Sequence, residues 1–195
     1  NAIVDWLPSP SELPPILGHR PDGRPVEVRR NTDEPFSALV FKIQCDPHLG
    51  RLAFIRVYSG KVDDGEYVYN NRTCSKARLT RLVRMHANKR THLDSVVAGD
   101  IAAAGLKEGA TGDTLTMPDN ELVLESIEFP EPVMQMAIEP MSTSDEKAME
   151  EALVSLESED PSFRVGVDED SGQTLIMGMG ELHLEIISNR KKKKK

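Results

Sequence analysis

The part of the sequence with the clearest chemical potential is a run of basic residues near the middle of the chain. From Arg72 to Leu93 the sequence holds seven cations and no carboxylate. These cations are Arg72, Lys76, Arg78, Arg81, Arg84, Lys89 and Arg90, and they are accompanied by His86 and His92. Lysine and arginine neutralise phosphates and release counterions, which gives affinity for nucleic acid without reading its base sequence. The run predicts a nucleic-acid-binding surface, and the alternative is a solvated face of a folded domain.

Two glycine-containing segments have part of a phosphate-binding pattern. Gly178-Met179-Gly180 is expected between a strand and a helix, where free N–H groups can bind phosphate, but His183 stands where a dinucleotide-binding motif needs glycine. In the segment Gly60–Gly65, Glu66 and Tyr67 follow in place of the lysine and hydroxyl residue of a P-loop. We interpret the first segment as a tight turn, with a phosphate-handling enzyme as the alternative, and we exclude a P-loop.

The histidines and cysteines do not form a metal-binding pattern. His183-Leu184-Glu185 has the H-x-E of zinc deaminases, but no P-C-x-x-C follows it. Neither Cys45 nor Cys74 belongs to a C-x-x-C pair, and no sequence context typical of a catalytic nucleophile is present. The sequence therefore predicts neither catalytic residues nor a metal site, and two isolated thiols favour a reducing compartment.

Charge is distributed unevenly along the 195 residues, whose net charge is −8. Between Asp119 and Asp170 there are sixteen acids, and Lys147 and Arg164 are the cations in that segment. Residues 191–195 are all lysine, and we interpret them as an added tail. No apolar run is long enough to span a bilayer, so we expect no membrane partner.

The basic run must be positioned by a β-rich domain, which we place at residues 36–120. Leu39, Phe41 and Ile43 alternate with polar residues and are expected to share one face of a strand. Further short strands are expected at 51–58, 66–69, 79–85, 95–97, 100–103 and 113–116, with turn residues between them. This pattern favours a closed β-barrel. The three-residue spacing of Arg78, Arg81 and Arg84 leaves a short helix as an alternative for that segment.

The flanking regions differ in character. Residues 1–35 are predicted to be the end of a preceding domain followed by a proline-rich linker, with loop structure over 17–35. Residues 121–190 follow the order strand, helix, strand, strand, helix. A capping box at Thr143 and Glu146 is expected to start the first helix, and Leu182 and Ile186 are expected to form the apolar side of the second. The predicted fold is an all-β barrel followed by an α+β ferredoxin-like βαββα domain lacking its last strand.

Several short segments together resemble elongation factor G. The segments that resemble its second domain are FSALVFKI (36–43), GRL (50–52), RVYSG (56–60), MHAN (85–88), AGDIAA (98–103) and TGDTL (111–115). The segments that resemble its third domain are EFPEPV (128–133), AIEP (137–140), EDPSF (159–163), SGQT (171–174) and GMGELHLEII (178–187). The resemblance covers nearly all of residues 1–190.

The resemblance implies a ribosome-binding middle fragment of a GTP-dependent translocase, which moves tRNA and mRNA through the ribosome. Its implied partners are small-subunit rRNA and protein, together with the upstream GTPase domain and the downstream domains of the parent. The implied ribosome contacts are Arg56, Ser59, Gly60, Arg78, Arg81, Arg84, His86, Lys89 and Arg90. Met179, Leu182 and His183 are similar to the family's fusidic-acid pocket. The expected location is the cytoplasm, with an organellar matrix as the alternative.

Two departures from the family pattern limit these expectations. The GTPase domain is expected to be absent, so the fragment should need no cofactor, whereas the parent uses GTP and magnesium. The match stops at Arg190, which leaves the third domain without its closing strand. A related ribosome-protection factor is the alternative within translation.

Overall fold

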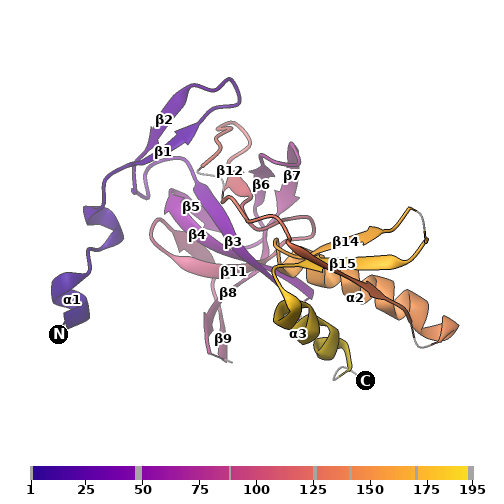
Figure 1. The fold of residues 1–195 in the computed structure, drawn as a ribbon. Helices are drawn as coiled ribbons and strands as arrows, with labels where there is room; N and C mark the ends of the chain where they lie inside the picture. Colours follow the sequence, from indigo (N-terminus) through magenta and orange to yellow (C-terminus); the bar gives the residue numbers. More distant parts are fainter. Residues whose placement is uncertain are drawn as a thin grey trace. The chain divides into compact units, whose positions relative to one another are not determined.

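The computed structural model describes residues 2–46, 50–87, 89–124, 127–140, 142–169 and 171–192, with the backbone alone at 3, 4, 143 and 190–192. The chain divides into two compact units, Asn1–Ile127 and Glu128–Lys195 (Figure 1). This division lies beyond the boundary expected at residue 120. The physical reason is that Leu122 and Leu124 are buried against the first unit.

The first unit begins with short elements and not with a long linker. Helix α1 (Ala2–Trp6) and a 3-10 turn η1 (Pro10–Glu12) precede the antiparallel strands β1 (Ile16–His19) and β2 (Pro25–Val28). The loop expected over 17–35 is therefore wrong. The hairpin is held because the N–H groups of His19 and Val123 each donate to the other's carbonyl oxygen at 2.8 Å.

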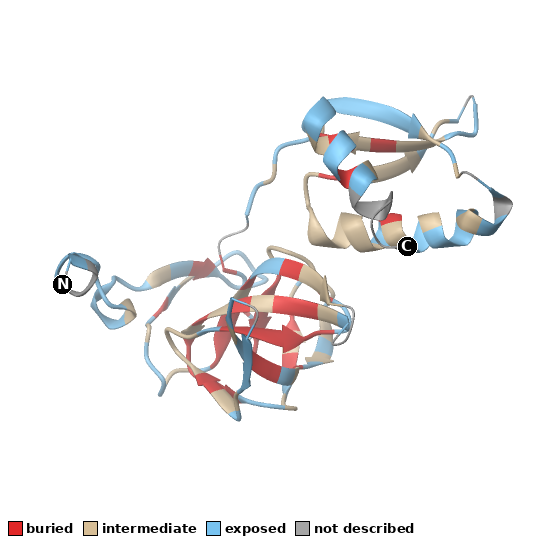
Figure 2. Cartoon of the chain, turned by 90° about the horizontal axis from the view of Figure 1, so that it is seen from below, coloured by how far each residue is buried: buried red, intermediate tan, exposed pale blue. Residues whose placement is uncertain are grey.

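An eight-stranded antiparallel sheet forms the body of the first unit. Its strands are β3 (Ser37–Asp46), β4 (Gly50–Ser59), β6 (Tyr67–Asn70), β7 (Ser75–Arg78), β8 (Thr80–His86), β9 (Lys89–His92), β11 (Ile101–Gly105) and β12 (Thr114–Thr116). Their order is β7-β6-β12-β3-β4-β11-β8-β9. Strands β5 (Lys61–Asp63) and β10 (Ser95–Val97) form a separate antiparallel pair. The sheet curls around one apolar core, which confirms the predicted barrel (Figure 2).

The core face of β3 differs from the expected alternation. Ala38, Val40 and Ile43 are buried in the barrel core, whereas Phe41 is 39% exposed. The pairing of β3 with β4 shifts between Val40 and Lys42, so one extra residue sits in β3 at this point. That bulge reverses the alternation, and the prediction that Leu39 and Phe41 share the core face with Ile43 is wrong.

The second unit is a three-stranded antiparallel sheet with two helices. Its elements are β13 (Met134–Ile138), the 3-10 turn η2 (Thr143–Asp145), α2 (Glu146–Glu159), β14 (Arg164–Val167), β15 (Thr174–Gly178) and α3 (Glu181–Lys192). The sheet order is β13-β15-β14. This βαββα order confirms the predicted ferredoxin-like arrangement. Within the described ranges, β13 pairs with β15 on one side and has no strand on its other side.

One local expectation for this unit needs correction, and another falls on a side chain outside the described residues. The buried side of α3 carries Leu184 and Ile187, whereas Leu182 is 68% exposed and Ile186 is 52% exposed. The helix is rotated this way because Gly178 lets Leu184 approach the end of β15 closely, where a Cβ would lie 2.7 Å from Leu184 Cδ2. Helix α2 begins at Glu146 after a 3-10 turn with no side-chain cap, and the side chain of Thr143 lies outside the described residues.

Candidate nucleic-acid interface

The second half of the basic run forms two antiparallel strands, β8 and β9, which extend from the barrel as a ribbon (Figure 1). The short helix considered for residues 78–84 is therefore absent from this segment. All four residues of β9 are exposed. A ribbon of this kind has two faces, because side chains alternate along each strand. Its tip includes Ala87, whose φ of 53° lies in the left-handed region.

One face of this ribbon carries cations that are nearly uncompensated. Arg84 lies opposite Thr91, and His86 lies opposite Lys89. We call these four residues the open arm face. Arg84 has a carboxylate oxygen of Asp100 at 3.7 Å, which is a loose ion pair between an exposed arginine and a half-buried aspartate. His86 and Lys89 make no ion pair with the residues that the structure describes.

The other face of the ribbon is neutralised by acids from elsewhere in the barrel. Arg90 donates to the carboxylate of Asp46 at 2.5 Å. His92 Nε2 lies 3.8 Å from Asp64 Oδ2 and 3.7 Å from Asp94 Oδ1. This arrangement directs the free positive charge to the open arm face. Arg90 therefore helps to fix the ribbon through Asp46, and its contact with rRNA stays a prediction.

A β-bulge at Arg81 shapes the base of the ribbon. Ala103 pairs with Val83 and Gly105 pairs with Thr80, so β8 uses one residue more than β11 across this interval. Arg81 takes up the excess with a φ of 55°, a left-handed conformation that is unfavourable for a residue with a Cβ. Leu82 and Val83 are then both buried, while Arg81 is exposed. The bulge therefore places a cation at the surface at some conformational cost.

Arg78 and Arg72 belong to a different hairpin, β6–β7. Arg78 lies opposite Tyr67, donates from Nε to the carbonyl oxygen of Gly65 at 2.8 Å, and stands 5.9 Å from the Tyr67 ring centroid. Arg72 Nε lies 2.5 Å from Asp113 Oδ1, and this hydrogen bond raises the pKa of the guanidinium. Asp113 is buried, so Arg72 has a structural partner.

Three predicted contacts lie on β4 or just after it. Arg56 is half-buried. Ser59 is 2% exposed, and its hydroxyl donates to the carbonyl oxygen of Pro35 at 2.6 Å. Gly60 is buried with a φ of 70°, and a Cβ there would lie 2.4 Å from the backbone nitrogen of Phe36. Ser59 and Gly60 therefore present no side chain to a ligand. Glycine is needed at position 60 because the backbone there has a positive φ and packs closely against Phe36.

In the second unit, His183 joins the start of α3 to the end of α2. Its Nδ1 accepts the N–H of Met179 at 3.1 Å, and its Nε2 lies 2.9 Å from Asp160 Oδ2. An Nδ1 that accepts leaves the proton on Nε2, which then donates to Asp160. Burial disfavours the charge of Asp160, but hydrogen bonds from Ser162 and His183 outweigh it and hold the pKa of this carboxyl below 3.8.

This geometry bears on the Gly178-Met179-Gly180 turn. The Met179 N–H, which a bound phosphate would need, is already bonded to His183. Gly178 serves close packing instead, because a Cβ there would lie 2.8 Å from His183 Nδ1. Met179 and Leu182 are exposed, whereas His183 is half-buried, so the three residues of the predicted drug-pocket-like corner differ in accessibility.

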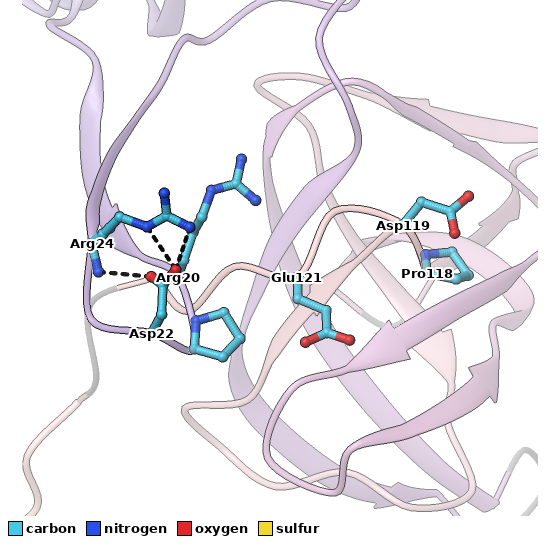
Figure 3. A pocket seen from close by; sticks show the side chains of 7 residues that line it. Arg20, Asp22, Arg24, Pro118, Asp119 and Glu121 are labelled. Carbon is cyan, nitrogen blue, oxygen red and sulfur yellow. Dashed lines mark hydrogen bonds and ion pairs between the residues drawn. The ribbon is translucent and has the colours of Figure 1, made fainter.

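An open cavity of about 410 Å³ lies between the turn of the β1–β2 hairpin and the loop around residue 119 (Figure 3). Its lining residues are Arg20, Pro21, Asp22, Arg24, Pro118, Asp119 and Glu121. Arg24 is tied to Asp22 by its Nε at 2.6 Å and its Nη2 at 2.5 Å. The lining offers no nucleophile and no histidine, so its residue types do not suggest a catalytic site.

Two absences hold for the part of the chain that the structure describes. No three histidine, cysteine, aspartate or glutamate side chains gather closely enough to hold a metal ion. None of the helices has the length and apolar character needed to cross a membrane.

Two tyrosines beside the cations were not among the residues predicted from the sequence to contact RNA. Tyr67 is 57% exposed and Tyr69 is half-buried, and both lie directly opposite basic residues of β7. The sequence could have indicated them, because the tyrosines occupy alternate positions of YVYN (67–70) and the cations occupy alternate positions of SKAR (75–78). Cations and aromatics then fall on the same face of one hairpin.

Comparisons with known proteins agree with this architecture. A family model described as Elongation factor G domain 2 matches residues 35–117, and one described as Elongation Factor G, domain III matches residues 129–195. The chain belongs to the elongation factor G family. A crystal structure of a protein from Thermus thermophilus is similar, with a TM-score of 0.75 and 28% sequence identity. The match covers 96% of this chain and 26% of that one, so the chain spans about a quarter of that protein's length.

Each of the two family matches lies within one structural unit and includes no residue of the other. The elongation factor G domain 2 match lies within Asn1–Ile127 and ends after β12. The domain III match begins just before β13 and covers all five regular elements of the second unit. The chain therefore carries elements of a translation elongation factor of the elongation factor G type.

Proposed function

We propose that this chain is the ribosome-binding part of an elongation factor that moves tRNA and mRNA through the ribosome. Its open arm face contacts phosphates of small-subunit rRNA, and its second unit links that contact to other domains of the parent protein. The observation that carries the proposal is the one-sided charge of the β8–β9 ribbon. Lys89 and His86 have no ion pair among the described residues, whereas Arg90 on the opposite face is bound to Asp46.

Simple electrostatics supports a backbone contact over a base-reading contact. Arg84 and Lys89 are exposed on a narrow projecting ribbon that can approach a phosphate chain. Such contacts release counterions, so their affinity falls steeply with salt. The same ribbon has a fixed position on the barrel through Arg90 and Asp46. A positioned cationic ribbon gives orientation on RNA, and sequence selectivity is not needed for it.

The test is co-sedimentation with small ribosomal subunits over a range of salt concentrations. Each phosphate contact contributes about −0.7 to −0.9 to the slope of log affinity against log salt. The double variant Arg84→Ala/Lys89→Ala should therefore flatten the slope by roughly one to two units. The matched control is Arg24→Ala, which removes an exposed arginine already bound to Asp22. An unchanged slope in the double variant would leave the ribbon as an ordinary solvated face.

The exposed residues at the start of α3 support a second part of the proposal. Met179 is 38% exposed and lies in the turn that His183 holds, and Leu182, just after that turn, is 68% exposed. We propose that Met179, Leu182 and His183 form one wall of a fusidic-acid pocket whose other wall comes from the parent's GTPase domain. Calorimetry should then detect no tight fusidic-acid binding by this chain alone. Tight binding would show that the pocket is complete without that domain.

A further inference from the structure

The outer face of the β6–β7 hairpin has an aromatic and basic composition that the β8–β9 ribbon lacks. Tyr67 lies directly opposite Arg78, and Tyr69 lies directly opposite Lys76. Residues that face each other across an antiparallel pair share a side of the sheet, as do residues two apart along a strand. Two tyrosines and two cations therefore form a compact four-residue surface. We call it the Tyr–cation face.

The hairpin that carries this face is firmly anchored beneath it. On the inner side, Val68 is fully buried in the barrel core and Ala77 packs against it. Asn70 is also buried, and its Nδ2 donates to Asp113 Oδ2 at 2.7 Å. The side-chain oxygen of Asn70 accepts the N–H of Arg72 at 3.0 Å. The outer side chains are thus displayed from a rigid support, which lowers the entropy lost when they bind a ligand.

The arrangement of Arg78 and Tyr67 suits a stacked ligand. The guanidinium is held by the 2.8 Å bond from Nε to the carbonyl oxygen of Gly65, and its terminal nitrogens make no hydrogen bond to the residues that the structure describes. Tyr67 remains 57% exposed although Arg78 stands 5.9 Å from its ring centroid. Large exposed aromatics beside fixed arginines are the elements on which unpaired nucleobases stack.

The charge around the face is compatible with a polyanion. Lys76 and Arg78 are exposed, and the carboxylate of nearby Glu66 accepts the N–H of Asp63 at 2.9 Å. Glu121 is the acid close to Tyr69. Burial first, and then Cys74 and Glu121, raise the pKa of Tyr69 above 10.0, so its hydroxyl remains a donor at neutral pH. Lys76 and Arg78 lie within the segment from Arg72 to Leu93, which contains no acidic residue.

From this juxtaposition we propose that the Tyr–cation face binds an unpaired segment of RNA, with one base stacked on Tyr67 and the adjoining phosphates bound by Lys76 and Arg78. The choice of RNA as the polyanion rests on the proposed function, since the ribosome is the partner proposed there. The site is separate from the open arm face, which offers phosphate contacts and no aromatic ring.

The experiment measures binding of fluorescent single-stranded oligouridine and oligoadenylate to the full chain by anisotropy, over a range of salt concentrations. Tyr67→Leu should weaken binding at least about fivefold and leave the salt slope unchanged, because stacking contributes affinity without neutralising phosphate. Tyr67→Phe should retain binding. Lys76→Ala and Arg78→Ala should each flatten the slope by about 0.7. Arg24→Ala is the matched control, and thermal melting checks that each variant folds.

Two further probes separate the possible outcomes. Duplex RNA should respond to Arg84→Ala/Lys89→Ala and not to Tyr67→Leu, and a glutamate oligomer of equal charge should compete poorly. The inference is overturned if Tyr67→Leu binds the oligonucleotides as tightly as the unsubstituted chain does, or if the substitution changes only the salt slope. It is also overturned if the acidic peptide competes as well as RNA. These readouts do not involve ribosomes, so the ribosome sedimentation test can fail while this site is retained, and the reverse also holds.

Discussion

Asp113 shows how a single buried carboxylate can organise the β6–β7 hairpin. It accepts hydrogen bonds from Asn70 Nδ2 at 2.7 Å, from the Ala110 N–H at 2.8 Å and from Arg72 Nε at 2.5 Å. Its side chain is 1% exposed. A buried carboxylate is stable only when its oxygens are bonded in this way, and its donors in turn depend on it.

Asp113→Ala should lower the free energy of unfolding of the first unit by about 3 kcal/mol, because it leaves buried donors without acceptors. Tyrosine fluorescence in urea can follow the change, since all three tyrosines lie in this unit. Asp22→Ala is the control, because Asp22 bonds to an exposed arginine and should change the free energy of unfolding far less. Equal losses in the two variants would contradict this account of Asp113.

Asp160 should make the stability of the second unit depend on pH. Its folded-state pKa lies below 3.8, so its stabilising contribution is present above about pH 4 and is lost as the pH falls through the lowered pKa. Asp160→Asn should therefore be less stable than the unsubstituted chain at pH 7, and this difference in the free energy of unfolding should shrink towards pH 3. Helical circular dichroism in urea measures this, since α2 and α3 hold most of the helix. A stability difference that stays constant with pH would refute the prediction. The control is Glu169→Gln, which changes an exposed carboxylate in the same unit.

At the scale of elements, the positions of strands that lie between turn residues can be predicted from the sequence. Which side chains of those strands face the core cannot. Turns at Gly60 and Gly65 delimit β4 and β6, so these two strands were expected close to where they lie, whereas β5 was not expected. The bulges in β3 and β8 depend on partner strands, so periodicity alone gave the wrong face for Phe41 and allowed a helix around Arg81. Arg90 and Asp46 are 44 residues apart, and no local pattern could reveal their pairing.

The bulge in β8 leads to a prediction with opposite effects on stability and binding. Arg81→Gly should raise stability by about 1 kcal/mol, because glycine adopts a φ of 55° without the strain caused by a Cβ. It should also weaken ribosome binding and flatten the salt slope by about 0.7 to 0.9. Arg84→Gly is the matched control, since it removes a neighbouring cation at an ordinary strand position and should lose about 0.5–1 kcal/mol of stability. Loss of stability in both variants would argue against strain at Arg81.

At the scale of the whole molecule, the two units differ in how much they bury. Among the residues that the structure describes, the barrel core contains sixteen buried apolar residues, whereas the second unit has a cluster of five. Figure 2 shows the buried positions gathered mainly in the barrel. Helix α3 also leaves Leu182 and Ile186 exposed. Because buried apolar area is the main stabilising contribution, the second unit should open at a lower free energy than the barrel.

Hydrogen exchange can test this difference directly. Amides of residues 181–190 should exchange much faster than those of residues 39–43, which lie between β12 and β4 in the barrel sheet. The comparison should be made under conditions where exchange reports the opening equilibrium. Equal protection in the two segments would mean that the second unit is stabilised by contacts beyond its own small core.

Strand β13 has a practical consequence for anyone who concentrates this protein. It carries five uncharged residues, MQMAI, and within the described ranges one of its edges meets no other strand. Lysine or proline within such a strand usually discourages self-assembly, and here Pro132 and Pro140 stand only outside it. The shelf life of a stock solution should therefore shorten as its concentration rises. Light scattering over a dilution series would show this, and Met136→Lys should suppress it if the edge is responsible.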